Sequence, residues 1–324
     1  MKAKDRVRAV TLRTAFIILF FIICIYSLSI GAHDFSLMGL FRGEEQEVFL
    51  TVISRLPRLL SIIITGAGLS IAGLIMQTIT NNKFVSPSTA GTMEWCRLGV
   101  LFAMLFTTGQ APLVRITMAF IVSLFGTLLF MSILQKIQIK NTFMIPLVGM
   151  MMGNVVSSFT SYVAYKYDLI QNMSSWLQGN FSLVLKGSYE ILYIGIPCIV
   201  IAYLYSSKFT IAGMGKSFAT SLGLNHKAVT TVGLVIVAFI TSLIVVTIGS
   251  VPFVGLIVPN IVSMYRGDHI KSSLFDTAFV GAFFVLLCDI IGRVIIYPYE
   301  VNVSVVISVL GSIIFLIILW KKKR

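Results

Sequence analysis

Long apolar segments recur along the chain and are separated by short stretches that hold most of its charged residues. Because a helix needs about 20 apolar residues to cross the hydrocarbon core of a bilayer, each segment predicts a membrane-spanning helix. Ten are expected, with approximate bounds 12–31, 56–79, 90–107, 113–135, 143–165, 188–206, 229–249, 254–265, 274–296 and 303–320. The eighth is short, which predicts a partial span or a segment buried among other helices. A short surface helix is expected at 170–184.

The composition indicates that the bilayer is the solvent of this chain. Of its 324 residues, 57% are hydrophobic and only 11% are charged, whereas about 25% of the residues in soluble domains are charged. We therefore predict an all-α polytopic membrane protein with a single transmembrane domain over 1–324. The N-terminal basic stretch and the apolar run from Leu12 to Ile30 resemble a signal peptide. The run is too long for one and shows no small-x-small cleavage site, so it is expected to remain as the first span.

Basic residues gather at both ends of the chain and in alternate loops. Since Lys and Arg are enriched on the cytoplasmic side, both termini are predicted to be cytoplasmic, which requires an even number of spans. The other loops assigned inside carry Lys83, Lys136, Lys140, Lys208, Lys216, Lys227, Arg266 and Lys271. The outside collects the acids Asp34, Glu44, Glu45, Glu47, Asp168, Glu190 and Glu300. The net charge of +13 is thus explained by membrane lipid, and no nucleic-acid partner is expected.

Residue types with catalytic or metal-binding chemistry form no recognisable pattern. The four cysteines lie in apolar stretches without a CxxC pair, which is typical of small core residues. The three histidines are far apart, so no metal site is expected. Without paired carboxylates or a His-Asp-Ser set, we do not expect the chain to be an enzyme.

One stretch imitates a nucleotide-binding motif. Residues 210–217 read TIAGMGKS, but Thr210 stands where a P-loop has its first glycine. A P-loop also follows a strand in a nucleotide-binding domain, whereas this stretch follows a predicted transmembrane helix. Nucleotide binding is therefore not expected here.

The same stretch belongs to the longest internal loop, at about 207–228. Met214, Phe218 and Leu222 recur every four residues and predict an apolar stripe on a short helix, which Gly223 could end. Ser217, Thr220 and Ser221 leave its other faces polar. Such a helix suits docking into a groove of a partner protein. The alternative is a helix that lies on the lipid headgroups.

Three arginines lie at the predicted outer ends of membrane-spanning helices, where positive charge is usually depleted. Arg55 and Arg58 lie at the outer end of the second span, and Arg293 lies near the outer end of the ninth. These side chains either extend to the headgroups or meet acidic groups of an external partner. A third interpretation is an internal pair of Arg293 with Asp289, four residues before it.

Glu94 and Arg97 place two charges inside the third span, three residues apart and on one helix face. Each charge at mid-membrane costs roughly 2.5–3.5 kcal/mol on insertion scales. Such residues are usually paired or turned toward a cavity. The two interpretations are a structural pair and the polar lining of a transport path.

Several motifs over nearly the whole chain resemble the FecCD-type permeases, a family similar to the vitamin B12 permease. They are SRLPRLL and GAGLSIAGLIMQ within 54–77, the stretch 82–91, VPFVGLIVPNIV within 251–266, CDIIGR at 288–293 and YEVNV at 299–303. The resemblance implies a type II ABC importer permease fold with ten helices. It also implies a bacterial cytoplasmic membrane location and two permease subunits per pore. Two ABC ATPase subunits inside would bind the ATP, a solute-binding protein would dock outside, and this chain would bind no cofactor.

The resemblance also assigns roles to residues. Arg55, Arg58 and Arg293 occupy positions that meet acidic residues of the binding protein. The 214–224 helix, with Met214, Ser217, Phe218, Ser221, Leu222 and Gly223, occupies the position that couples to the ATPase. Asn141 and Thr142 fall where the family places its inner gate.

Departures from the family pattern refine the expected cargo. The sequence GTMEWCR at 91–97 replaces a small-polar run, and Pro259-Asn260 replaces the usual Pro-His. Thr92-Met93-Glu94, together with YDLIQN at 167–172, looks like the branch that imports catecholate siderophores such as petrobactin or enterobactin. That branch often pairs two different permeases, so both a homodimer and a heterodimer stay open. We predict an iron(III)-siderophore importer permease. The alternatives are haem or cobalamin import by the same machinery, and an ion-coupled secondary transporter in which Glu94 and Arg97 form the ion site.

Overall fold

The computed structural model describes residues 3–30, 39, 42–88, 91–136, 144–267 and 269–322. Its longer helices are α1 (Ala3–Ser29), α4 (Leu56–Ile79), α5 (Thr92–Phe106), α6 (Pro112–Lys136), α7 (Met144–Lys166), α9 (Gly195–Gly213), α11 (His226–Ile248), α12 (Val254–Arg266), α13 (Ile270–Val294) and α14 (Val303–Lys322). The shorter ones are α3 (Glu45–Leu50), α8 (Ile170–Leu177) and α10 (Lys216–Ser221). A π-helical turn, Thr51–Arg55, joins α3 to α4, and a 3₁₀ turn, Glu190–Ile194, leads into α9.

Each of the ten predicted segments overlaps one of the longer helices, which confirms the prediction of an all-helical membrane protein. Among the described residues, seven helices are long and apolar enough to cross a membrane. The helices α5 and α12 have only 15 and 13 residues, about 22 and 20 Å at 1.5 Å per residue, so each is shorter than the hydrocarbon core. The prediction of ten crossings therefore remains a prediction.

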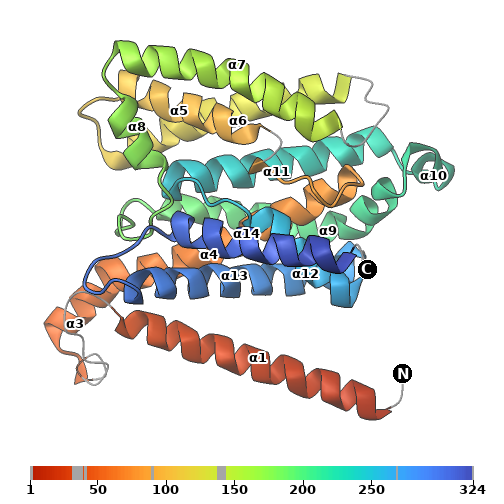
Figure 1. Ribbon diagram of the computed structural model, residues 1–324, viewed down its shortest axis with the longest axis horizontal. Coiled ribbons are helices and arrows are strands. Elements are labelled where there is room, and N and C mark those ends of the chain that lie inside the picture. The colour runs from red at the N-terminus through yellow and green to blue at the C-terminus, as the bar shows by residue number, and fades with distance from the viewer. Residues whose placement is uncertain are drawn as a thin grey trace.

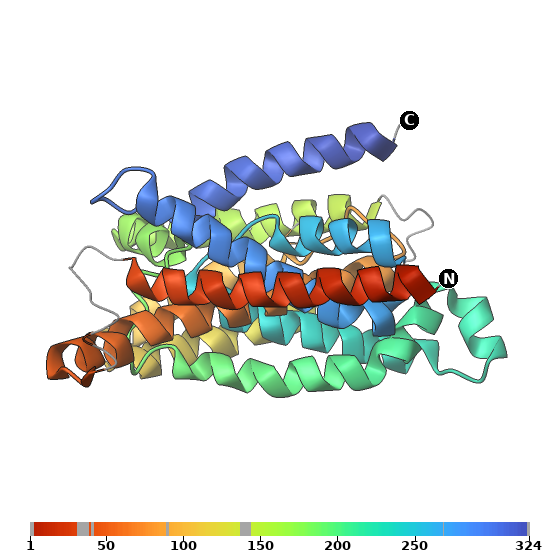
Figure 2. The same ribbon diagram turned by 90° about the horizontal axis from the view of Figure 1, so that it is seen from below.

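The long helices run side by side, so the bundle has two ends (Figure 1). One end holds α10 together with the start of α1 and the end of α14. The opposite end holds α3 and the turn between α13 and α14. The helices α7 and α1 form two edges of the bundle, and α14 stands out from a third side (Figure 2).

Helix α4 lies at the centre and packs against α9, α11, α12 and α13. In its most apolar stretch 78% of the residues are buried. Close approach explains the small residues there: a side chain at Gly66 would collide with the backbone of Gly281 in α13, and one at Gly73 with the backbone of Gly255 in α12. Small residues allow such contacts where burial of apolar area between helices supplies no drive.

The peripheral helices keep their apolar side chains on the outside. Only 22% of the residues in the apolar stretch of α7 are buried, and only 17% of those in α14. Exposed Phe159 on α7 and Leu316 on α14 illustrate these faces. A soluble bundle would bury such surfaces, whereas lipid tails or another membrane subunit can cover them.

Two predicted boundaries are wrong. The helix expected at 170–184 ends at Leu177, because Gln178 is extended and pairs with Ser250, and Gly179 packs directly on the Ser250 carbonyl. The span expected at 188–206 lies further along the chain, with a 3₁₀ turn before α9 and a helix end at Gly213. At the end of α8, tertiary contacts override the local apolar pattern.

Candidate functional site

Arg58 lies at the end of the bundle opposite α10 and is held by two carboxylates. Its Nε and Nη2 donate to Oδ1 of Asp289 at 3.3 and 2.8 Å. Its Nη1 donates to both carboxylate oxygens of Glu300, at 3.0 and 2.9 Å. Four of the five N–H donors of the guanidinium are therefore engaged within the chain. Arg58 and Glu300 stay partly accessible, with side-chain exposures of 15% and 28%.

Arg293 is buried in the same cluster. Its Nη2 lies 2.7 Å from Oδ2 of Asp289, and the two side chains are only 4% and 2% exposed. Its Nη1 donates to the carbonyls of Ser27 and Ile30 at 2.8 and 3.0 Å, and its Nη2 donates to the Ser27 hydroxyl. The geometry therefore corresponds to the internal pair of Arg293 with Asp289. An external carboxylate could reach Arg293 only after this pair had opened, and the expected docking role of Arg293 remains a prediction.

Arg55 ends the π-helical turn that precedes α4. Its Nη1 donates to the carbonyl of Leu28 near the end of α1, and the residue is half-buried. In the same π-helical turn, the carbonyl of Ile53 accepts from the backbone N–H of Lys186 at 3.0 Å. This hydrogen bond ties the 178–189 loop to the turn. Arg55 thus lies beside the Arg58 cluster and anchors the neighbouring end of α1.

Glu300 lies in the turn between α13 and α14, outside the helices that can cross the membrane. Burial opposes ionisation of its carboxyl, but Arg58, the Ser182 hydroxyl and Arg293 together outweigh burial and lower the pKa of Glu300. A carboxyl with a lowered folded-state pKa stabilises the fold at neutral pH, and this contribution is lost as the pH falls through the lowered value. Glu300 therefore stays ionised beside Arg58 at neutral pH.

Glu94 and Arg97 lie on the first turns of α5 and line a cavity of about 490 Å³. Their contact is single and long, 3.4 Å from Nη1 to Oε2, and the side chains are 24% and 39% exposed. A tight structural pair would be closer and more buried. The remaining wall of the cavity comes from Ser88, Met93, Ser174, Leu177, Gln178, Val245 and Ser250. The two charges thus face a polar cavity between α5, α8 and α11.

Asn141 and Thr142, the expected inner gate, lie outside the described residues. Their predicted role remains a prediction.

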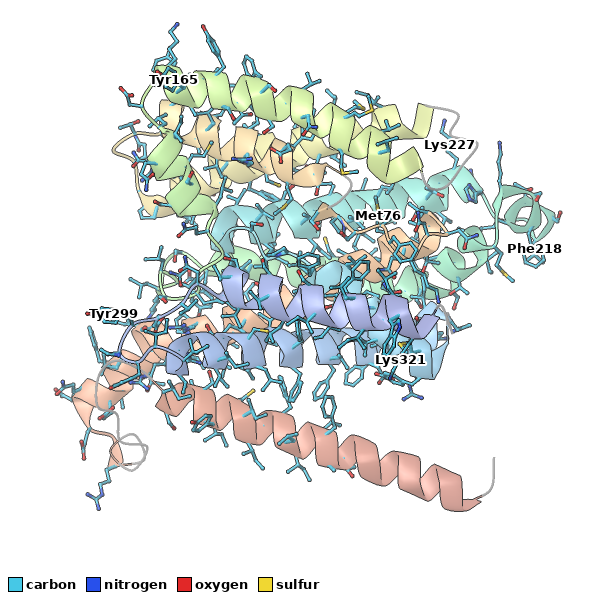
Figure 3. The ribbon with its side chains drawn as sticks, in the orientation of Figure 1. Met76, Tyr165, Phe218, Lys227, Tyr299 and Lys321 are labelled. Carbon is cyan, nitrogen blue, oxygen red and sulfur yellow. The ribbon has the colours of Figure 1, made fainter. Side chains whose placement is uncertain are left out.

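Helix α10 projects from the opposite end of the bundle, with Phe218 at its exposed side (Figure 3). Met214, Phe218 and Leu222 are 62, 46 and 59% exposed, which is high for large apolar side chains. The helix itself is shorter than the expected 214–224: it begins after Gly215 and ends before Gly223, and both glycines have positive φ. Ser217 and Ser221 lie on its exposed polar face. Residues 210–213 belong to α9, so the first half of the P-loop-like stretch 210–217 is helical and forms no loop that could hold a phosphate.

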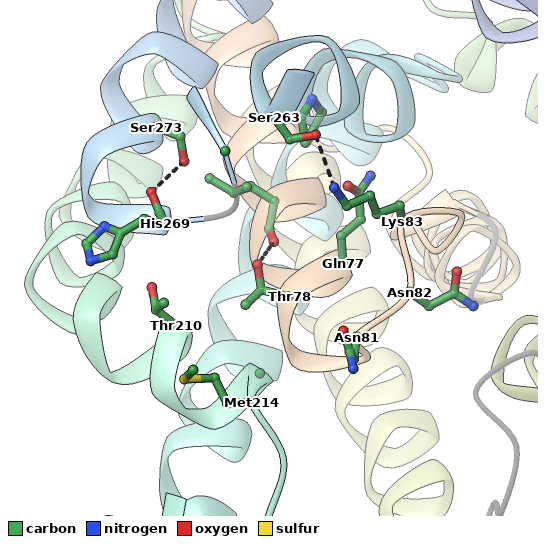
Figure 4. Close-up of a pocket in the computed structure, with 14 residues that line it drawn as sticks. Gln77, Thr78, Asn81, Asn82, Lys83, Thr210, Met214, Ser263, His269 and Ser273 are labelled. Atoms are coloured by element: carbon green, nitrogen blue, oxygen red, sulfur yellow. Dashed lines mark hydrogen bonds between the residues drawn. The ribbon is translucent and has the colours of Figure 1, made fainter. Parts of the chain in front are cut away.

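A second cavity, of about 550 Å³, lies where α4, α9 and α12 end and α13 begins (Figure 4). Its polar lining includes Gln77, Lys83 and His269, and Lys83 Nζ donates to Ser263 Oγ at 3.4 Å. Met214 also lines it, so the apolar stripe of α10 starts at the wall of this cavity. Sequence reasoning missed this cavity because its walls come from segments up to about 200 positions apart.

The partners of Arg58 were also missed. Asp289 and Glu300 are 231 and 242 positions away in the sequence, so no local spacing connects them to Arg58. The sequence does carry one signal for Glu300. The loops predicted to lie outside are acidic, which predicts Glu300 on the same side of the membrane as Arg58.

Comparisons with known proteins agree with this architecture. The profile of the FecCD transport family matches residues 18–321. The petrobactin import system permease protein YclN of Bacillus subtilis is 55% identical over 312 residues, which cover 96% of this chain and 98% of YclN. The ferric-anguibactin transport system permease protein FatD of Vibrio anguillarum is 37% identical, with 94% and 97% covered. The petrobactin import system permease protein FatD of Bacillus anthracis is 36% identical, with 95% and 90% covered.

A solved structure has the same fold. It is an inward-facing conformation of an ABC transporter assigned to the metal-chelate type, with a TM-score of 0.84 and 24% sequence identity. The match covers 96% of this chain and 99% of the other.

Asp289→Asn should destabilise the protein, because it removes the charge that balances Arg293 while keeping the shape of the side chain. Loss of one partner of a buried ion pair costs about 3–5 kcal/mol. We expect a clear fall in the thermal unfolding temperature of the purified protein in lipid nanodiscs. Asp168→Asn is the control, since Asp168 is exposed and its left-handed conformation suits asparagine. Equal unfolding temperatures for the two variants would contradict a structural role of the cluster.

Proposed function

The chain belongs to the FecCD transport family, and from this we propose that it is the permease subunit of an ABC importer for iron(III)-siderophore complexes. The strongest support is the 55% identity to a petrobactin import permease over nearly the full length of both chains. The relatives from Vibrio anguillarum and Bacillus anthracis are likewise named for iron-chelate import. Family membership favours this function over an ion-coupled secondary transporter.

We further propose ten membrane crossings with both termini in the cytoplasm. The start of α1 and the end of α14 lie at the same end of the bundle, which fits an even number of crossings (Figure 1). Basic residues at that end include Lys216 on α10 and, as Figure 3 shows, Lys227 and Lys321, as expected for the cytoplasmic side. The Arg58 cluster then faces the outside of a bacterial cytoplasmic membrane.

Under this orientation, each end of the bundle receives its own partner. An ATPase subunit would bind the exposed apolar stripe of α10 and would hold the ATP, so the permease itself is not the catalyst. A siderophore-binding protein would dock outside, near Arg55 and Arg58. The exposed faces of α7 and α14 leave room for a second permease subunit, identical or different, beside lipid.

The cargo would pass along a polar path that includes the Glu94–Arg97 cavity, with Asn141 and Thr142 near its inner end. Arg97 is suited to contact the cargo, because its only contact within the described part of the chain is the long one with Glu94. Ferric complexes with several anionic oxygen donors carry negative charge and offer the acceptors that a guanidinium needs. ATP-driven movement of α10 would then open one side of the path while the other is closed.

The cargo can be tested by uptake of radioactive iron. Cells that lack other siderophore importers, and that express this permease with its neighbouring ATPase and binding-protein genes, should accumulate iron supplied as ferric petrobactin. Haemin and cobalamin supplied in excess should not reduce this uptake. Uptake of haemin or cobalamin in place of the ferric chelate would move the assignment to another cargo.

Phe218→Asp should uncouple the importer, because it puts a charge into the apolar stripe that we assign to the ATPase groove. Loss of a central apolar anchor in an interface costs about 2 kcal/mol or more, so uptake should fall at least about tenfold. Thr220→Asp adds the same charge on the polar face of α10 and is the control. If the Phe218 variant keeps normal uptake and normal binding of the ATPase, the coupling role is wrong.

A double-mutant cycle separates the two interpretations of Glu94 and Arg97. If Arg97 contacts the cargo, Arg97→Gln should lower ferric petrobactin uptake about tenfold, since hydrogen bonds to charged groups contribute about 1.5–3 kcal/mol. Arg97→Lys should keep part of the uptake, and Glu94→Gln most of it. A purely structural pair predicts a different pattern: both single variants would fail alike, and the neutral double variant would recover.

A further inference from the structure

The two carboxylates that hold Arg58 differ in how firmly they are fixed. Asp289 is shared between Arg58 and Arg293, and its side chain is only 2% exposed. Removing it from the cluster would leave two arginines without their common acid. Glu300 instead belongs to the exposed turn between α13 and α14, and its side chain is 28% exposed. Of the two carboxylates, Glu300 is therefore the one that can move away from Arg58.

Glu300 also connects two segments of the outer end. Besides Arg58, its carboxylate accepts a hydrogen bond from the Ser182 hydroxyl. Ser182 lies in the 178–189 loop, which is joined to the turn before α4 through the Lys186 N–H and the Ile53 carbonyl. Glu300 therefore links this loop to the turn between α13 and α14 (Tyr299 in Figure 3 marks the turn).

The charge balance of the cluster limits how an acidic partner can bind. Two arginines face two carboxylates, and Glu300 stays ionised at neutral pH because its pKa is lowered. A third carboxylate that approached the intact cluster would find only one N–H of Nη2 without a partner, because Asp289 and Glu300 take the other four, and it would meet a like charge on Glu300. Its attraction to Arg58 becomes strong only when Glu300 has moved away, since bidentate pairing needs both donors of one side of the fork.

We propose that Glu300 is an internal competitor of the partner's carboxylate for Arg58. In the free permease, Glu300 fills the position on Arg58 that a carboxylate of the external binding protein takes after docking. Docking is then an exchange of one carboxylate for another, while Asp289 keeps Arg58 and Arg293 in place. The displaced Glu300 also releases Ser182, so arrival of the partner loosens the link between the two outer segments. This inference rests on the proposed function, which places a binding protein at this end.

The exchange predicts that removing the competitor strengthens docking. Glu300→Gln keeps the size of the side chain but removes its charge, so it should bind Arg58 less well. We expect the dissociation constant of the binding protein encoded with the permease to fall about tenfold for this variant, measured by biolayer interferometry on the importer complex in nanodiscs. Ser182→Ala, which removes one anchor of Glu300 without any change of charge, should lower the dissociation constant about twofold.

Two controls make the result specific. Glu190→Gln removes a negative charge at the same end, but Glu190 accepts from the Gly187 N–H, whereas Arg58 pairs with Asp289 and Glu300, so docking should be unchanged. In an Arg58→Gln background, Glu300→Gln should have no further effect, because there is nothing to compete for.

The outcomes separate this inference from the proposed function. If the wild-type permease binds the protein and Glu300→Gln does not bind it more tightly, carboxylate exchange is wrong while the proposed function stands. An equal gain for Glu190→Gln, or a gain that persists without Arg58, would also overturn it. If the wild type does not bind the protein at all, both the exchange and the proposed external partner are wrong.

Discussion

The close contact of α4 with its neighbours is the constraint on which the rest of this structure depends. Gly66 and Gly73 let the α4 backbone touch α13 and α12 directly, at the backbones of Gly281 and Gly255. These contacts fix the position of both ends of α4. One end carries Arg58 into reach of Asp289 on α13, and the other carries Gln77 to the carbonyls of Gly255 and Leu256 on α12. The two ends of the bundle are therefore built on the same helix.

Electrostatics divides the two ends of the bundle. At the end that holds Arg58, opposite charges are paired inside the chain, and burial makes the pair of Arg293 and Asp289 costly to open. At the α10 end, large apolar side chains remain exposed on a short helix, and a partner surface can cover them at low cost. One end thus favours a partner that exchanges charged groups, and the other favours a partner that buries apolar area.

The sequence predicts the helices well because a long apolar run has few alternatives in a bilayer. The bounds of α4, expected at 56–79, agree with the structure to the residue. Of the three apolar residues that local periodicity predicts on one stripe, only Phe218 lies on α10, while Met214 and Leu222 flank the helix, and all three are exposed. Local patterns fail where distant segments decide the outcome. Ser250 ends α8 early, and the carboxylates that hold Arg58 come from more than 200 positions away.

Arg293 illustrates the limit most clearly. Its place near the end of a span is visible in the sequence, and so is Asp289 one turn before it. Whether the guanidinium points outward or into the protein depends on the end of α1. There the carbonyls of Ser27 and the following Ile30 accept hydrogen bonds from the guanidinium. No periodicity in the sequence of α13 encodes that contact. The family resemblance supplied the position, and only the packing shows its surroundings.

The two glycines that border α10 have a consequence for how this segment can vary. Gly215 and Gly223 both adopt positive φ, a backbone conformation that residues with a side chain rarely take, so the two glycines fix where the segment begins and ends. Between them the helix turns by about 100° per residue. An insertion or deletion of one residue would rotate Phe218 away from its present direction, whereas a conservative substitution would not. The length of this segment is therefore more tightly constrained than its composition.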